Sequence, residues 1–164
     1  MNTALRFLLL LSLPLYVADQ LTKWLVLQHI GSDEVVPVIP GFLNLVQVHN
    51  TGAAFGMLKD NNFFFVLLSG TALVVVAALA RKGAFSGTLT RIGCALLVPG
   101  ILGNLTDRIL RGFVVDFLDV TLPWYGHWPA FNIADSCICI AAALFIVDGF
   151  LPGKKDPLAM PDPG

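Results

Sequence analysis

The stretch Gly100–Asp135 reads GILGNLTDRILRGFVVDFLDVTLPWYGHWPAFNIAD. It places charged residues where apolar segments give way to polar ones. Two carboxylates stand out, Asp116 in Val-Val-Asp-Phe and Asp135 in Phe-Asn-Ile-Ala-Asp-Ser. Since each follows or begins an apolar run, we predict that the two lie at neighbouring ends of membrane-spanning segments and form a pair.

The composition favours an integral membrane protein. The chain has 164 residues, of which 56% are hydrophobic and 13% are charged, and its mean hydropathy is +0.78. Soluble domains carry roughly 25% charged residues, so a soluble domain with a large core would lack the polar surface that it needs. The net charge of -1, without a basic run, argues against nucleic-acid binding. The three histidines are scattered without a metal-ligand spacing, so neither a metal site nor a cofactor is expected.

Four apolar runs are long enough to cross a hydrocarbon core of ~30 Å. The first run opens like a secretory signal peptide, but Tyr16 fits poorly at a cleavage site after Ala18 and the apolar character resumes at Trp24. We therefore expect it to be retained, and we predict an all-α membrane protein with four transmembrane helices. The spans cover residues 5–27, 63–80, 92–111 and 132–151, in a single domain of residues 1–151; residues 152–164 form a tail, which the composition predicts to be disordered.

The segments between the spans differ in character. Residues 28–62 carry Gly, Pro and β-branched residues, and the parts 34–40 and 42–49 are predicted as short strands of a β-element on the membrane surface. Residues 112–130 are predicted as a loop whose aromatic residues suit a membrane interface. Lys and Arg concentrate beside the two termini and between the second and third spans. The positive-inside rule then places both termini in the cytoplasm, and segments 28–62 and 112–130 outside.

Charged residues inside the spans are functional candidates by default. Asp19 and Lys23 stand four apart on one helical face and are expected to pair; they either shape a site or form a structural ion pair only. A polar face of the third span is expected to point into the bundle, with Gly103 allowing another backbone to approach. An interhelical polar clamp is the alternative for this face, whose members are Gly103, Asn104, Asp107, Arg108 and Arg111.

The chemistry of Asp116 and Asp135 depends on their surroundings. Asn132 is a good N-cap for the fourth span, which would put Asp135 at the N3 position, where the helix dipole stabilises negative charge. Two neighbouring carboxyls do not easily both ionise and share a proton. One can then activate water while the other protonates a carbonyl oxygen, as in an aspartic protease. Asp119 is expected to be a solvated loop residue.

The sequence around Asn50 is a further candidate site. Its side chain could bind an extended peptide backbone, and Gly52 leaves room beside it. The alternative is a glycine-containing turn that leads into the second span.

Five blocks of sequence together resemble the lipoprotein signal peptidases, the bacterial type II signal peptidases. The resemblance covers nearly all of residues 5–151, with the blocks in the family's order. They are Asp19-Gln-Leu-Thr-Lys23, Asn50-Thr-Gly-Ala-Ala-Phe55, Gly103-Asn-Leu-Thr-Asp-Arg108, Val114-Val-Asp-Phe117 and Phe131-Asn-Ile-Ala-Asp-Ser136.

This resemblance implies a four-helix aspartic endopeptidase of the inner membrane, with a small extracytoplasmic β-cradle, an outer loop or helix, and no metal. Such enzymes remove the signal peptide from prolipoproteins just before a cysteine that carries a diacylglyceryl group, and they are inhibited by globomycin. The catalytic pair maps onto Asp116 and Asp135. The supporting positions map onto Asp19, Lys23, Asn50, Gly52, Gly103, Asn104, Arg108 and Asn132.

Two other readings compete with a peptidase. A small ion- or proton-coupled transporter would also use intramembrane charges, but it predicts a midplane site and repeated halves, which this sequence does not show. A non-catalytic assembly factor would use the polar residues as glue between helices.

Overall fold

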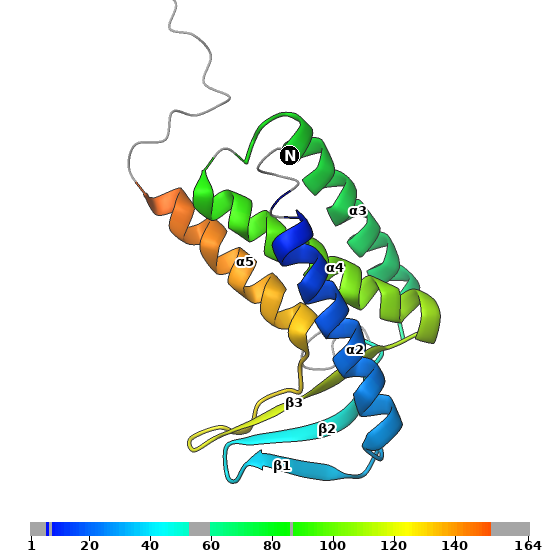
Figure 1. The fold of residues 1–164 in the computed structure, drawn as a ribbon. Helices are drawn as coiled ribbons and strands as arrows, with labels where there is room; N and C mark the ends of the chain where they lie inside the picture. The colour runs from blue at the N-terminus through cyan, green and yellow to red at the C-terminus, as the bar shows by residue number, and fades with distance from the viewer. Residues whose placement is uncertain (1–5, 7, 53–59, 86, 152–164) are drawn as a thin grey trace, which may run out of the picture.

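The computed structural model describes residues 6, 8–52, 60–85 and 87–151. Four helices run along one another, and a β-sheet covers one end of the bundle (Figure 1). The helices are α2 (Leu13–His29), α3 (Asn62–Arg81), α4 (Thr88–Arg111) and α5 (Ile133–Phe150), with a π-helical turn η1 (Leu8–Ser12) leading into α2. The predicted tail 152–164 and residues 53–57 beside Asn50 lie outside the described residues.

The four predicted spans are confirmed as helices. Among the described residues, α3, α4 and α5 are long and apolar enough to cross a membrane, and α2 with η1 forms the N-terminal helix. The third span begins at Thr88 rather than Ile92, and the first extends to His29. Helix α4 packs against α2, α3 and α5 and is the most buried of the three candidate spans. Asn104 and Asp107 of α4 therefore lie inside the protein rather than against lipid.

Two glycines let α4 approach its neighbours closely. A β-carbon on Gly100 would lie 2.7 Å from the carbonyl oxygen of Ala134 in α5. A β-carbon on Gly103 would lie 2.5 Å from Oδ2 of Asp19 and 3.0 Å from the β-carbon of Ala134. We expected another backbone to approach Gly103, but the space is taken by the Asp19 carboxylate and the Ala134 methyl group.

The sheet has four antiparallel strands in the order β1-β2-β3-β4. The predicted strands correspond to β1 (Val35–Ile39) and β2 (Leu43–Asn50). The prediction of a loop over residues 112–130 was wrong, because this segment forms β3 (Val114–Leu122) and β4 (Gly126–His127). Its Val, Phe, Leu and Thr residues suit a strand, and β2 supplies the hydrogen-bonding partner that a local reading cannot reveal.

Strand β3 joins the sheet to the helices through opposite faces. Val115 and Phe117 pack with Val26 of α2 in a buried apolar cluster. Since successive side chains of a strand alternate between faces, the Asp116 side chain points away from this cluster. Asp116 pairs with Val48 of β2 in the ladder, so the β2–β3 pairing brings the end of β2 beside it.

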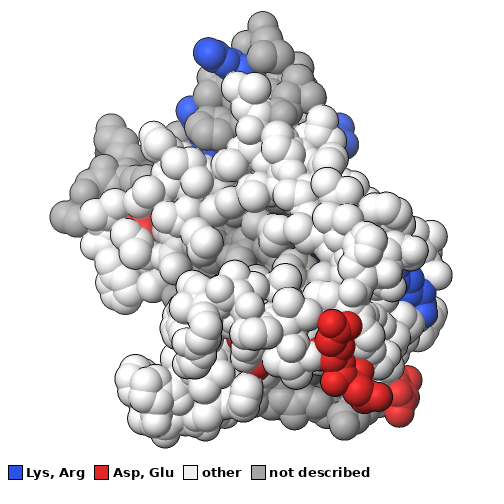
Figure 2. All heavy atoms as spheres, turned by 60° about the horizontal axis from the view of Figure 1, so that its bottom comes forward, with Lys and Arg blue, Asp and Glu red and all other residues white. Residues whose placement is uncertain are grey.

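The two ends of the molecule carry opposite charges. Exposed Arg81, Lys82 and Arg91 lie at the α3–α4 end of the bundle, whereas exposed Asp33 and Glu34 lie between α2 and β1. In Figure 2 the sheet end comes forward; acidic side chains gather at its edge, and most of the visible Lys and Arg side chains lie toward the far end.

Candidate active site

Helix α5 begins with the predicted cap. The Asn132 side-chain oxygen accepts a hydrogen bond from the backbone N–H of Asp135 at 2.9 Å, and Asp135 Oδ2 accepts one from the backbone N–H of Asn132 at 3.1 Å. This reciprocal capping box satisfies two N–H groups at the helix start. It also fixes the Asp135 carboxyl at the N-terminal end of α5.

The same asparagine holds Asp116. Its Nδ2 group donates to Asp116 Oδ1 at 2.7 Å, to the carbonyl oxygen of Val115 at 3.3 Å and to Asn104 Oδ1 at 3.2 Å. Both carboxyls therefore contact the same residue, Asp116 through the Asn132 side chain and Asp135 through its backbone N–H, although they lie 19 positions apart in sequence. The structure thus brings Asp116 and Asp135 to the same asparagine.

Burial controls the protonation of Asp116. The residue is 2% exposed, and removal from water, together with the negative charge of Asp135, raises its pKa from 3.8 to about 7. Hydrogen bonds from Asn50 and Asn132, and the positive charge of Lys23, act in the opposite direction. Asp116 consequently keeps its proton at a pH where an exposed aspartate would be ionised.

Each carboxyl receives a second amide donor. Asn50 Nδ2 donates to Asp116 Oδ2 at 2.9 Å, and Asn104 Nδ2 donates to Asp135 Oδ1 at 2.7 Å. Asn50 is itself oriented by the backbone N–H of Gly52, which donates to its oxygen at 3.0 Å.

Arg108 of α4 supports the part of the site around Asn50 and Gly52. Its Nη2 group donates to the carbonyl oxygen of Gly52 at 3.1 Å, and its guanidinium lies 4.8 Å from the centre of the Phe65 ring. It also interacts electrostatically with Asp116 and Asp135. Arg108 therefore fixes the turn after Asn50 and adds positive charge near the pair.

The predicted Asp19–Lys23 pair lies beneath the carboxyls. Lys23 Nζ contacts Asp19 Oδ2 at 2.9 Å and donates to Asn104 Oδ1 at 3.0 Å. Asp19 Oδ1 accepts the backbone N–H of Ala134 at 2.9 Å, which ties α2 to the first turn of α5. The ion pair is therefore linked to the carboxyl pair through Asn104.

Asp107 is a member of this network that the sequence reasoning placed in the bundle but not among the site residues. Its Oδ2 lies 3.1 Å from Lys23 Nζ and accepts the backbone N–H of Val115 at 3.1 Å. Its Oδ1 accepts from Arg111 and from Gln20. The spacing of three from Asn104 was the available signal, whereas the bond to Val115 depends on the position of β3.

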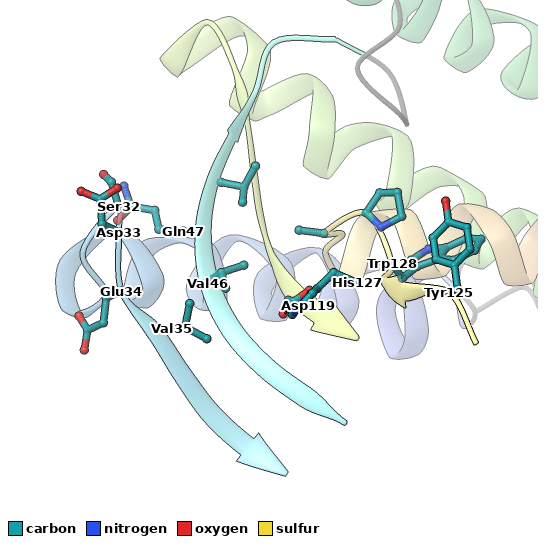
Figure 3. A pocket seen from close by; sticks show the side chains of 13 residues that line it. Ser32, Asp33, Glu34, Val35, Val46, Gln47, Asp119, Tyr125, His127 and Trp128 are labelled. Carbon is teal, nitrogen blue, oxygen red and sulfur yellow. Dashed lines mark hydrogen bonds and ion pairs between the residues drawn. The ribbon is translucent and has the colours of Figure 1, made fainter. Parts of the chain in front are cut away.

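Asp119 was expected to be a solvated loop residue, and this was wrong. It is buried in β3, where its carboxylate accepts from Asn44 Nδ2 at 2.8 Å and contacts His127 Nδ1 at 2.9 Å. Figure 3 shows Asp119 and His127 side by side in an open groove of about 490 Å³, whose lining includes neither Asp116 nor Asp135. Since Asp119 is three residues past Asp116 on the same strand, the two point to opposite faces.

The described residues offer no cluster of three or more His, Cys, Asp or Glu side chains that could hold a metal ion. What they offer instead is a buried and a partly buried carboxyl, with three hydrogen bonds from side-chain amides, one from a backbone N–H and a nearby positive charge. This set can hold one proton between two carboxyls and so serve acid and base steps on a single substrate.

Comparisons with known proteins agree with this chemistry. Residues 11–151 match the family described as signal peptidase (SPase) II. The chain is 42% identical to a lipoprotein signal peptidase of Syntrophotalea carbinolica, over 92% of this chain and 94% of the relative. It is 44% identical to a lipoprotein signal peptidase of Vibrio cholerae, over 90% of this chain and 88% of the relative. A solved structure described as a bacterial membrane enzyme superposes with a TM-score of 0.81 at 33% identity, covering 90% of this chain and 92% of that chain.

The fold and these likenesses define a multi-pass bacterial membrane enzyme. The chain belongs to the signal peptidase II family, whose members are aspartic-type peptidases. Family membership favours a peptidase over a transporter or an assembly factor as the explanation for the buried charges.

Asn132→Ala tests the junction between the two carboxyls. The variant should lose peptidase activity by about tenfold or more, because Asp116 loses a donor and the helix turn that carries Asp135 loses its cap, and helix stability by ~1 kcal/mol. Asn61→Ala is the matched control, since Asn61 is the N-cap of α3 and makes no side-chain cap bond. Cleavage rate and thermal unfolding of the detergent-solubilised proteins measure both effects. Equal activity in the two variants would contradict the role of Asn132.

Proposed function

We propose that this chain removes signal peptides from prolipoproteins whose cysteine carries a diacylglyceryl group, cutting just before that cysteine, with Asp116 and Asp135 as the catalytic residues. The observation that carries the proposal is Asn132, whose side chain donates to the Asp116 carboxyl and whose backbone N–H donates to the Asp135 carboxyl. The relatives' name, lipoprotein signal peptidase, supports the substrate class.

The two carboxyls take different roles in this mechanism. Asp116, with its raised pKa, is the protonated member and donates to the oxygen of the scissile carbonyl. Asp135, at the helix N-terminus, is the carboxylate that takes a proton from water as the water oxygen attacks the carbonyl carbon. The tetrahedral intermediate then collapses as the C–N bond breaks: the proton on Asp135 passes to the leaving amine, and one hydroxyl of the intermediate returns its proton to Asp116 as it becomes the new carbonyl.

The remaining polar residues support this geometry. Asn50 and Asn104 orient Asp116 and Asp135, respectively, while Arg108 fixes Gly52 at the edge of the site. Gly103 leaves the space that Asp19 occupies, and Asp19 and Lys23 hold α2 against α4 and α5. Together with Asn132, these assignments account for the eight supporting positions as parts of one connected network.

The position of the pair suits a substrate that is partly in the membrane. Asp135 lies in the first turn of α5 and Asp116 in β3, where the helices meet the sheet. An apolar signal helix and two acyl chains favour lipid, whereas the scissile bond needs water. We place the sheet on the outer face and both ends of the described chain on the cytoplasmic side, because the exposed basic residues lie at the opposite end from the sheet.

Asp116→Asn and Asp135→Asn should each abolish cleavage of a diacylglyceryl-modified prolipoprotein, with a loss of about a thousandfold or more, because neither amide can exchange the required proton. Asp119→Asn is the matched control: this buried carboxylate lies on the same strand but contacts Asn44 and His127 instead. Globomycin should block cleavage by the wild-type chain and by the control. Near-normal cleavage by either Asp116→Asn or Asp135→Asn would remove the pair from the mechanism.

The pH dependence of cleavage follows from Asp116. Because burial and Asp135 raise its pKa to about 7, Asp116 remains protonated below that pH and loses its proton above it. Cleavage by the wild-type chain should therefore fall as the pH rises through about 7. Initial rates across this range, at saturating substrate, measure the alkaline limb. A rate that stays level well above this pH would show that Asp116 is not the proton donor.

The orientation can be tested with single cysteines in a cysteine-free background. Ser32→Cys lies in an exposed turn beside β1, and Lys82→Cys lies in an exposed turn after α3. A membrane-impermeant thiol reagent should label the first variant in intact spheroplasts and the second only after lysis. The reverse pattern would invert the proposed topology.

A further inference from the structure

The carboxylate of Asp107 is buried in the same network as the pair. Asp107 of α4 is fully buried, yet it lies among groups of opposite charge and an N–H donor from another element. Oδ2 accepts from the backbone N–H of Val115 and contacts Lys23 Nζ, both at 3.1 Å. Oδ1 accepts from Arg111 Nη1 and, at 3.4 Å, from Gln20 Nε2. One side chain of α4 thus contacts both α2 and β3.

The hydrogen bond to Asp107 holds the backbone of Val115, the residue that precedes Asp116. The N–H of Val115 is held by Asp107, and its carbonyl oxygen is held by Asn132 Nδ2 at 3.3 Å. Val115 is itself fully buried against Val26 and Phe117. The residue before Asp116 is therefore clamped between α4 and α5, which leaves the Asp116 side chain little freedom in position.

Asp107 also balances the positive charges of Lys23 and Arg111. Lys23 and Arg111 carry two positive charges, and Asp19 and Asp107 carry two negative charges, so the group is neutral. Lys23 donates another hydrogen bond to Asn104 Oδ1, which turns the Asn104 amide nitrogen toward Asp135. A change in this balance therefore acts on the carboxyl pair through Lys23 and Asn104.

The charged and titratable groups around the pair come from every element packed against it. Strand β2 contributes His49, which stacks on Phe113. The helices contribute Asp19 and Lys23 of α2, Asp107, Arg108 and Arg111 of α4, and Asp135 of α5.

We propose that Asp107 is a positioning residue for the reaction: it anchors the start of β3 so that Asp116 meets Asp135, and it balances Lys23 and Arg111 beneath the pair. This inference rests on the proposed function of Asp116 and Asp135. It assigns Asp107 no contact with substrate, and it predicts two separable effects, one on the turnover rate and one on its pH dependence.

The turnover effect depends on the acceptor for Val115. Asp107→Ala removes it, and kcat should fall about ten- to a hundredfold while KM changes little, because a small displacement of Asp116 impairs proton transfer. Asp107→Asn keeps a side-chain oxygen at this position and should retain more of the turnover. Asp119→Asn is the control, because Asp119 is a buried carboxylate of β3, the strand that carries Val115 and Asp116, and does not contact this network. The variant should behave like wild type.

The pH effect depends on charge, and its sign differs between variants. Asp107→Asn leaves an excess positive charge, which favours the ionised pair and should move the alkaline limb of kcat to lower pH. Arg111→Gln leaves an excess negative charge and should move it to higher pH. Each shift should be on the order of half a pH unit, since the charge acts at a distance from the pair. Asp107→Asn combined with Arg111→Gln restores neutrality and should return the limb toward its wild-type position.

The experiment is a kcat and KM measurement against pH on the full chain in detergent, with a diacylglyceryl-modified prolipoprotein as substrate. The position of the limb does not depend on the active fraction, so partial misfolding cannot imitate it; if Asp107→Ala does not accumulate, Arg111→Gln and the double variant decide. The proposal is supported if Asp107→Asn and Arg111→Gln shift the alkaline limb of kcat in opposite directions and the double variant returns it toward the wild-type position. It is overturned if the limb lies at the same pH in all variants. If Asp116→Asn retains activity, the proposed function fails instead, whatever the Asp107 variants do.

Discussion

The ammonium group of Lys23 has no access to solvent, so its charge must be balanced and its donors satisfied inside the protein. Removing such an ion from water costs several kcal/mol unless partners with good geometry are present. Asp19 of its own helix and Asp107 and Asn104 of α4 provide these partners at 2.9 to 3.1 Å. Placing them there requires α2 and α4 to pack closely, which Gly103 permits. The polar interior thereby fixes how two helices of a lipid-facing protein pack, where apolar contacts alone would specify little.

Asn132 transmits this fixed arrangement to the carboxyl pair. Its amide group contacts Asp116 of the sheet and Asn104 of α4, while its oxygen caps α5. An asparagine suits this position because it offers both a donor and an acceptor without a charge. The site therefore does not belong to one element: it forms only when the sheet, α4 and α5 are all in place.

The parts of the site that depend on short spacing could be predicted from sequence. The N-cap at Asn132 with Asp135 three residues on, and the pair Asp19–Lys23 at four, are both local geometry. The pairing of β3 with β2 is not local, so the sequence by itself predicts a loop over residues 112–130 and a solvated Asp119, and neither prediction holds. The same limit hid the bond from Val115 to Asp107. The places of Asp116 and Asp135 at the ends of apolar runs predicted that they pair, and the family resemblance agreed, but the contacts that support the pair had to come from the structure.

The capping box gives Asp135 two tasks, because the carboxyl proposed to accept a proton from water also accepts the N–H at the start of α5. A neutral carboxyl is a weaker acceptor than a carboxylate. In the proposed mechanism the first turn of α5 is therefore held most tightly before water is activated and least tightly while the intermediate exists. The Asp135 carboxyl thus serves both the helix cap and the reaction. A substitution that strengthens the cap at Asp135 would therefore also make Asp135 a weaker base.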